Sequence, residues 1–186
     1  GCLLPGRRIE GLFFGFPAAG LDVDAANAFT ATQAKHAPGS RAAMLVTPEM
    51  DPEQVRETAR CEGFAGLKPY HLFARTQPTF EALLPDYLPE AQVRVAHEEG
   101  LVIVLHLVRP RALADPANQE WIRRYAEGYP NARFVLAHAA RGFNPYHTVE
   151  GIEALRGLGN VWCDTSGVTE CGAVEAIARV LGPERI

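Results

Sequence analysis

The sequence predicts an α/β fold, in the form of a (β/α)8 TIM barrel of which about six βα units are present. Six short apolar runs recur along the 186 residues, and most are followed by a polar loop and an amphipathic segment. The runs are largely continuous in apolar residues, as is typical of strands covered on both faces. Six units in 186 residues leave about 31 residues per unit, as in a barrel of about 250 residues.

The elements follow one another regularly. The predicted strands span 9–16, 41–47, 63–69, 101–107, 133–138 and 160–165. The predicted helices lie within 21–36, 47–63, 88–100, 115–130, 148–159 and 172–182, and 73–87 is expected to be a long loop with a helical turn. Asp22 or Asp24 suits the first helix start, and Gly63 and Gly100 suit two helix ends.

An open doubly wound sheet is the alternative architecture. Its nucleotide-binding versions lose support because no GxGxxG follows the first strand and no GxxxxGK[ST] occurs anywhere. A strand followed by a helix, six times over, indicates parallel strands with right-handed crossovers in either architecture. The length suits a single domain over 1–186.

Composition excludes several classes of function. Hydrophobic residues make up 47% and charged residues 22%, and the formal net charge of −4 favours neither nucleic acid nor an anionic membrane as a partner. No apolar stretch approaches the roughly 18–20 residues of a membrane span, and the first residues do not resemble a signal peptide. We therefore expect a cytoplasmic protein with reduced thiols at its four scattered cysteines, Cys2, Cys61, Cys163 and Cys171.

Chemically capable side chains stand at the ends of four consecutive predicted strands. Lys68, His106, His138 and Asp164 are separated by 38, 32 and 26 residues, about one βα unit each. In a barrel the carboxyl ends of the strands face one mouth, so these side chains are expected to converge. Imidazoles are ligands for zinc and other divalent transition metals, and a bound water then loses its proton near neutral pH.

Each of these residues also has a plainer interpretation. A histidine at a strand end often bonds a carbonyl group in the core, although two at the same register make this less attractive. Lys68 could be a solvated cation or an ion-pair partner, and Asp164 could be a turn residue that bonds the backbone of Thr165 or Ser166. Tyr70, in the loop after Lys68, is expected to line the mouth with its neighbour His71.

The segments GLKP, IVLHL and FVLAHAAR together resemble the amidohydrolase superfamily, specifically the amidohydrolase-related branch that includes aminocarboxymuconate-semialdehyde decarboxylase. The resemblance runs over nearly the whole chain. It implies a metal-dependent barrel that hydrolyses C–N or C–O bonds, as most members do, or one that decarboxylates or hydrates. It identifies His106 as a metal ligand, and His138 as a ligand or as the residue that contacts the nucleophilic water or the substrate.

The resemblance also bears on the cationic residues. Lys68 falls on the strand where some members carry a carboxylated lysine, but the following Pro69 favours a cation that binds substrate. Arg141, three residues after His138, is expected to hold a substrate carboxylate through a bidentate contact. With Tyr70, these residues form the expected substrate-binding set, beside a divalent metal that is expected to be zinc.

The sequence departs from the family pattern at both ends. It has no HxH pair of the kind the family carries on strand 1, and it stops at GPERI, before the strand 8 aspartate. Asp164 lies one strand too early to replace that aspartate. We therefore expect strands 2–7 of a barrel, as a fragment that is inactive by itself, since two imidazoles do not complete a zinc site.

Three functional hypotheses follow. The first is a metal-dependent hydrolase in which a metal-activated water attacks a C–N or C–O bonded carbon of a small molecule. The second is a decarboxylase on the same site, favoured by Lys68 and Arg141 as carboxylate-binding residues. The third is a catalytically dead partial barrel, a binding module that forms a homo-oligomer by pairing its open sheet edges.

Overall fold

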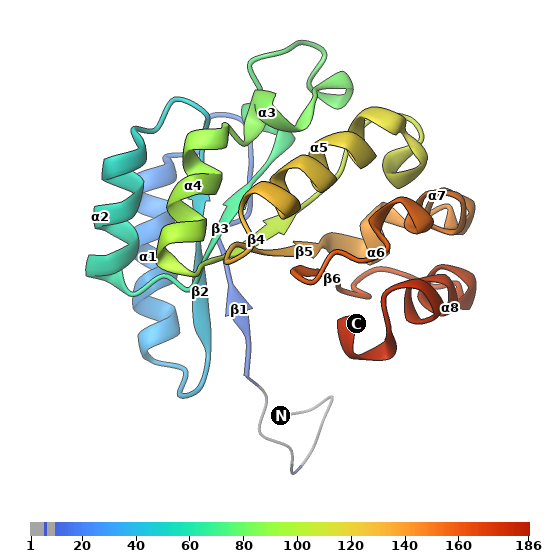
Figure 1. The fold of residues 1–186 in the computed structure, drawn as a ribbon. Helices are drawn as coiled ribbons and strands as arrows, with labels where there is room; N and C mark the ends of the chain where they lie inside the picture. The colour runs from blue at the N-terminus through green and yellow to red at the C-terminus, as the bar shows by residue number, and fades with distance from the viewer. Residues whose placement is uncertain (1–5, 7–9) are drawn as a thin grey trace.

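The computed structural model describes residue 6 and residues 10–186. Its six strands are parallel and form one sheet in sequence order, which curls into part of a barrel with helices around its outside (Figure 1). The strands are β1 (Leu12–Phe13), β2 (Arg41–Val46), β3 (Gly66–Pro69), β4 (Val102–Leu105), β5 (Arg133–Leu136) and β6 (Val161–Cys163). This order confirms the predicted α/β partial barrel.

Most predicted helices form where the sequence places them. The α-helices are α1 (Val23–Lys35), α2 (Pro52–Glu62), α3 (Leu84–Tyr87), α4 (Glu90–Glu99), α5 (Pro116–Gly128), α6 (Ala137–Arg141), α7 (Pro145–Gly151) and α8 (Cys171–Val180). Asp22 is the N-cap of α1, where its side chain accepts a hydrogen bond from the backbone of Ala25. Gly63 and Gly100 end α2 and α4 with positive φ values of 75° and 65°, which glycine adopts easily.

The helix predicted within 148–159 is the clearest difference among the helices. The structure begins it earlier, as α7, ends it at Gly151, and continues with a 3-10 turn at Ile152–Leu155. Gly151 packs so closely on the backbone of Leu113 that a Cβ there would lie 2.4 Å from the Leu113 carbonyl oxygen. This close packing needs a glycine at the helix end.

The central strands form the core, as their apolar sequences predict. Leu45, Leu67, Ile103 and Phe134 are fully buried. The first strand behaves differently, because β1 pairs with only two residues of β2 and its side chains are exposed. The expectation that every run is covered on both faces is therefore wrong for β1, which lies at the sheet edge; Ile9, the first residue of that run, lies outside the described residues.

A side chain of α1 completes the hydrogen bonding of β2 beyond the short β1 strand. The buried Asn27 donates from Nδ2 to the carbonyl oxygen of Leu45 at 2.9 Å and accepts from the Leu45 amide at 2.7 Å. An unpaired buried amide and carbonyl would each be costly. Asn27 thus replaces a strand partner at this level of β2.

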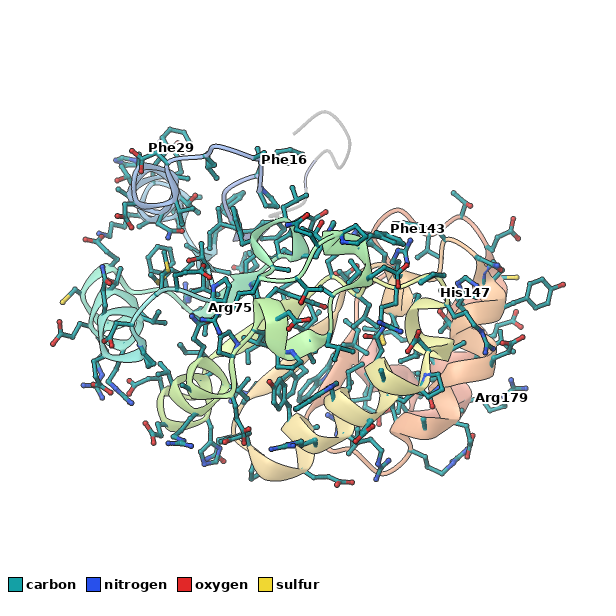
Figure 2. All side chains as sticks on the ribbon, turned by 90° about the horizontal axis from the view of Figure 1, so that it is seen from above. Phe16, Phe29, Arg75, Phe143, His147 and Arg179 are labelled. Atoms are coloured by element: carbon teal, nitrogen blue, oxygen red, sulfur yellow. The ribbon has the colours of Figure 1, made fainter. Side chains whose placement is uncertain are left out.

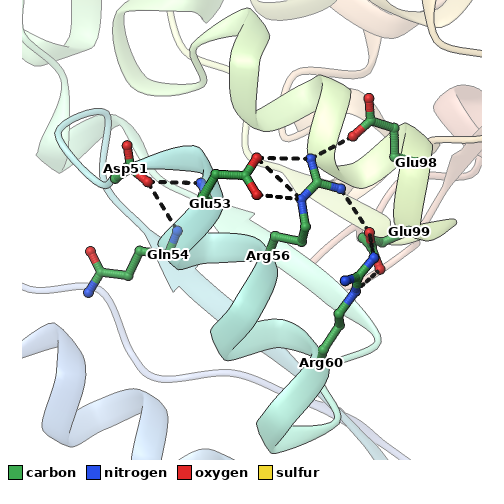
Figure 3. A network of polar contacts seen from close by, with 7 residues as sticks. All are labelled: Asp51, Glu53, Gln54, Arg56, Arg60, Glu98 and Glu99. Carbon is green, nitrogen blue, oxygen red and sulfur yellow. Dashed lines mark hydrogen bonds and ion pairs between the residues drawn. The ribbon is translucent and has the colours of Figure 1, made fainter.

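Outside the sheet, an ion-pair network joins α2 to α4 (Figure 3). Arg56 contacts Glu53 on its own helix, and Glu98 and Glu99 on α4, at 3.1, 2.6 and 2.8 Å. Arg60 adds a second contact to Glu99, and hydrogen bonds from Arg60 and Arg56 lower the pKa of the Glu99 carboxyl group. The network ties together two helices that cover the outside of the sheet.

The expectations for the cysteines and for membrane-spanning helices can be compared with the described residues. The described cysteines, Cys61, Cys163 and Cys171, are free thiols, whereas Cys2 lies outside the described residues. Burial raises the pKa of the Cys163 thiol to about 12. Across residue 6 and residues 10–186, no helix has both the length and the apolar character that a membrane crossing requires.

Candidate active site

A cavity of about 560 Å³ lies at the carboxyl ends of the strands. Most of its wall is apolar, and Phe16, labelled in Figure 2, contributes from the segment after β1. The residues that line it are Leu12, Phe14, Phe16, Pro17, Lys68, Tyr70, Val104, His106, Val135, Ala137, His138, Asp164 and Ser166. The cavity therefore contains four of the five residues assigned to the site from sequence, and Arg141 is the exception.

The two histidines converge as their spacing predicts. His106 directly follows β4, and His138 follows β5 by two residues. Their ring centroids are 5.1 Å apart, with an interplanar angle of 77°. Because parallel pairing aligns Leu105 with Leu136, the residues after each strand reach the same end of the sheet.

His106 is held as a neutral imidazole. Burial lowers its pKa to about 3, with further lowering by the charges of Lys68, His138, His71 and Arg141. The rings of Tyr70 and His71 lie 5.2 and 6.0 Å from its ring, so His71 packs against His106 beside the cavity. A neutral imidazole is the form that binds a metal ion.

Lys68 lies in β3 with only 3% of its surface exposed. Its Nζ is 3.4 Å from the carbonyl oxygen of Val104, and 5.0 and 5.6 Å from the ring centroids of Phe14 and Tyr70. Burial lowers the pKa of the amine to about 8, an effect that the charge of Asp164 partly opposes. No ion-pair partner for Lys68 occurs within the described part of the chain, so the interpretation as a solvated cation does not fit this site.

Arg141 is not among the residues that line the cavity, although its charge acts on Tyr70 and His106, which do. One guanidinium nitrogen donates to the carbonyl oxygen of Arg109 at 2.8 Å, and the guanidinium carbon lies 4.4 Å from the centre of the Phe80 ring. Partial burial lowers the pKa of Arg141, while Tyr70 opposes this shift. Arg141 therefore already has a carbonyl and an aromatic partner, with no carboxylate paired to it in residues 6 and 10–186.

The turn that carries His138 has an unusual backbone. His138, Ala139, Ala140 and Arg141 have φ values of 60°, 51°, 60° and 62°, so α6 is a left-handed turn of four non-glycine residues. The amide of Gly142 donates to the carbonyl oxygen of His138 at 2.6 Å. The left-handed conformation costs non-glycine residues roughly 1–2 kcal/mol each, so contacts around the turn must hold it.

Asp164 supplies such contacts and acts as a turn residue, as its plainer interpretation predicts. Its Oδ1 accepts from the backbone amides of His138 and Ser166, both at 2.9 Å, and from the Ser166 hydroxyl. The Ser166 carbonyl oxygen and Oγ lie 2.7 and 3.0 Å from His138 Nδ1. Sequence reasoning did not assign Ser166 to the site, because only the fold brings it to a histidine 28 residues away.

The residues present fit a divalent metal in part. His138 uses Nδ1 in its contact with Ser166, which leaves Nε2 for a ligand, and His106 is neutral. A protein carbonyl on the second nitrogen is the usual support of a metal-bound histidine. No group of three or more His, Cys, Asp or Glu side chains that could hold a metal occurs in residues 6 and 10–186. The described residues thus offer two imidazoles where a catalytic zinc site has three protein ligands.

The family follows from comparison with known proteins. A model of the family described as Amidohydrolase matches residues 3–186. The chain belongs to the amidohydrolase family. No curated protein matches it significantly.

Solved structures agree with this family in fold. An amidohydrolase from Burkholderia multivorans superposes with a TM-score of 0.62 at 16% identity, covering 87% of this chain and 62% of that one. A 2,6-dihydroxybenzoate decarboxylase from Rhizobium has a TM-score of 0.56 at 15% identity, covering 88% and 64%. A dihydroxybenzoic acid decarboxylase from Polaromonas sp. JS666, with bound manganese and the inhibitor 2-nitroresorcinol, has a TM-score of 0.58 at 17% identity. The match covers 88% of this chain and 62% of that one. This amidohydrolase chain thus spans less than two thirds of the length of each.

Proposed function

We propose that this amidohydrolase chain carries part of the active site of a metal-dependent hydrolase that acts on a small molecule. The observation that supports the proposal is the convergence of His106 and His138, with rings 5.1 Å apart, on one largely apolar cavity. A divalent metal bound there would activate a water molecule toward a C–N or C–O bonded carbon. Zinc suits imidazole ligands, and the Polaromonas enzyme holds manganese, so we propose one of these two ions.

The protein residues have separate roles in this proposal. His106 binds the metal through its neutral ring. His138 uses Nε2 either as a second ligand or to take a proton from the attacking water. Lys68 and Tyr70 bind an anionic group of the substrate inside the cavity, and Arg141 binds a substrate carboxylate. Since desolvation strengthens charge pairing, a carboxylate beside Lys68 would be held more firmly than in water.

The proposal extends to the domain, the substrate and the cellular location of the protein. We treat residues 1–186 as a single domain that contributes six βα units to a barrel. The substrate is a small molecule, because the cavity of about 560 Å³ has the size of a small-molecule site. The scattered cysteines and the ordinary composition are the basis for proposing the cytoplasm as its location.

Decarboxylation on the same site is the second candidate, and Lys68 favours it. A buried amine with no ion-pair partner in the described chain suits a substrate whose carboxylate is taken out of water. Two of the similar structures, from Rhizobium and Polaromonas, are decarboxylases of hydroxylated benzoates. In this alternative Lys68 and Arg141 hold the carboxylate, and His138 delivers a proton to the carbon that loses carbon dioxide.

Turnover by a Mn²⁺- or Zn²⁺-loaded protein that carries residues 1–186 together with the remaining strands of the barrel tests both candidates. A panel of lactones and amides is assayed for acid release, and a panel of hydroxylated benzoates for carbon dioxide. We expect His138→Ala to lower kcat by at least about 100-fold, as loss of a general acid or base does. His36→Ala, at the exposed end of α1, is the matched control and should leave kcat unchanged. Full turnover in His138→Ala would contradict the assignment.

A further inference from the structure

We infer that Ser166 is a positioning residue that fixes His138 in the form with its proton on Nδ1, and that Asp164 holds Ser166 in place. The hydroxyl and the carbonyl of Ser166 both lie within hydrogen-bond distance of His138 Nδ1. The Asp164 carboxylate accepts hydrogen bonds from the Ser166 hydroxyl and from the backbone amide of His138. The effect of Ser166 on catalysis rests on the proposed function. The position of the proton on the His138 ring can be measured whether or not that function is correct.

The identities of the donors and acceptors fix the proton. The carbonyl oxygen of Ser166 lies 2.7 Å from His138 Nδ1 and can only accept a hydrogen bond, so Nδ1 must carry the hydrogen. Ser166 Oγ lies 2.5 Å from Asp164 Oδ1 and donates its hydrogen to that carboxylate. Oγ therefore presents a lone pair to Nδ1 at 3.0 Å, and the one N–H is shared between two acceptors.

Asp164 joins the two chain segments that hold this contact. Besides the Ser166 hydroxyl, Oδ1 accepts the backbone amides of Ser166 and His138 at 2.9 Å each. The carbonyl oxygen of Asp164 accepts from the Ala139 amide at 2.6 Å. The loop after β6 thus bonds two successive amides of the left-handed turn after β5, and these bonds oppose the strain at His138 and Ala139.

The ring is also confined from its side. Phe143 lies 4.9 Å from the His138 ring centroid at a shallow angle of 35°, and His106 lies edge-on at 5.1 Å. Rotation of the ring would lose the Ser166 contacts and this packing together. His138 Nε2 has no protein hydrogen-bond partner in residues 6 and 10–186, so it keeps a free lone pair beside the cavity. That nitrogen is the one a metal or a proton would occupy.

Nitrogen-15 NMR of the 186-residue chain, labelled on histidine, tests the inference directly. Spectra are recorded without metal at pH 8.5, above the ordinary range of imidazole pKa values, and His138 is assigned with His138→Gln. We expect the Nδ1–H form to dominate at His138. Ser166→Ala should shift the ratio toward Nε2–H by about fivefold, the factor for one lost hydrogen bond. Ser166→Thr keeps the hydroxyl and should keep the ratio.

Thr165→Ala is the matched control, because it removes a hydroxyl from the same exposed loop without touching His138. A wild-type spectrum with Nε2–H dominant at His138 would overturn the inference, and so would an unchanged ratio in Ser166→Ala. If Ser166→Ala does not fold, the wild-type and Ser166→Thr spectra still decide the protonation pattern.

Kinetics separate this inference from the proposed function. In an active preparation Ser166→Ala should lower kcat by about fivefold with little change in KM, and Ser166→Thr should restore it. If the spectra are as expected but His138→Ala retains full turnover, the proposed role of His138 fails and the hydrogen-bond arrangement stands. If His138→Ala abolishes turnover but the spectra show Nε2–H, only the role of Ser166 fails.

Discussion

Lys68 is a cation in an apolar place. The chain has two lysines, and the other, Lys35, is exposed and paired with Glu62 at 2.9 Å. Lys68 instead lies between two aromatic rings in a strand of the core, and its burial lowers the pKa of its amine to about 8. Such an arrangement destabilises the fold, so we attribute it to substrate binding.

Replacing Lys68 with methionine should therefore stabilise the protein in a pH-dependent way. With a folded pKa of about 8 and an unfolded pKa of about 10.4, burial of the protonated amine costs about 3 kcal/mol below pH 8. The unfolded state binds more protons between these values, so wild-type stability rises with pH there and the advantage of Lys68→Met disappears above about pH 10.4. Urea unfolding at pH 7, 9 and 10.5 measures this, with Lys35→Met as control. A gap that is constant with pH would contradict it.

For single residues, the sequence predicts which side chains reach the cavity better than it predicts their hydrogen-bond partners. Lys68, His106 and His138 reach one cavity as expected, because strand ends can be read from apolar runs. Arg141 does not line this cavity, and its guanidinium packs on Phe80, so its role in binding a substrate carboxylate stays a prediction. The Ser166 contact was not foreseen, since hydrogen bonds between separate loops depend on loop conformations that no local pattern encodes.

Among the elements, the left-handed turn 138–141 does most to place the site. Nothing in the letters HAAR indicates positive φ values, because the usual signal is glycine, asparagine or aspartate. The turn changes the direction of the chain directly after β5, and the backbone amide of His138 donates a hydrogen bond to Asp164 in the loop after β6. Its alanines are fully buried, and small side chains are needed there for packing.

A glycine in this turn should cost far less stability than one in a strand. Ala140→Gly loses a buried methyl group but gains roughly 1–2 kcal/mol from relief of the left-handed strain, so we expect a net change near zero. Ala43→Gly, at an equally buried position in β2, should cost about 1.5 kcal/mol. Chemical denaturation of both variants measures the difference. Equal losses at the two positions would show that the turn is not strained.

The bounds of the other helices and strands can be predicted from the sequence with different accuracy. Helices with an aspartate cap and a terminal glycine, such as α2, were located closely. The length and exposure of β1 were not, because its apolar letters do not reveal that it is an edge strand with only two paired residues. The early end of α7 was missed as well, since it depends on the close packing of Gly151 on Leu113.

The whole molecule is a curled parallel sheet (Figure 1). The carboxyl ends of β3, β4, β5 and β6 contribute side chains to one cavity. This architecture was predictable, because repeated βα units leave few topologies. An incomplete metal site was expected from the sequence as well, since the sequence contains no HxH pair of the kind the family carries on strand 1. The described residues supply two imidazoles, and the chain spans less than two thirds of the similar structures from Burkholderia, Rhizobium and Polaromonas.

Titration of the protein with Mn²⁺, followed by calorimetry, tests the central claim that a metal ion binds to His106 in the cavity that His138 also lines. We expect His106→Ala to weaken binding by about tenfold or more and His36→Ala to bind as the wild type does. His138→Ala should weaken binding to a similar extent if His138 is the second ligand, and should leave it unchanged if His138 only takes a proton from the attacking water. Equal Mn²⁺ affinity in the wild type and in both single variants would contradict the claim.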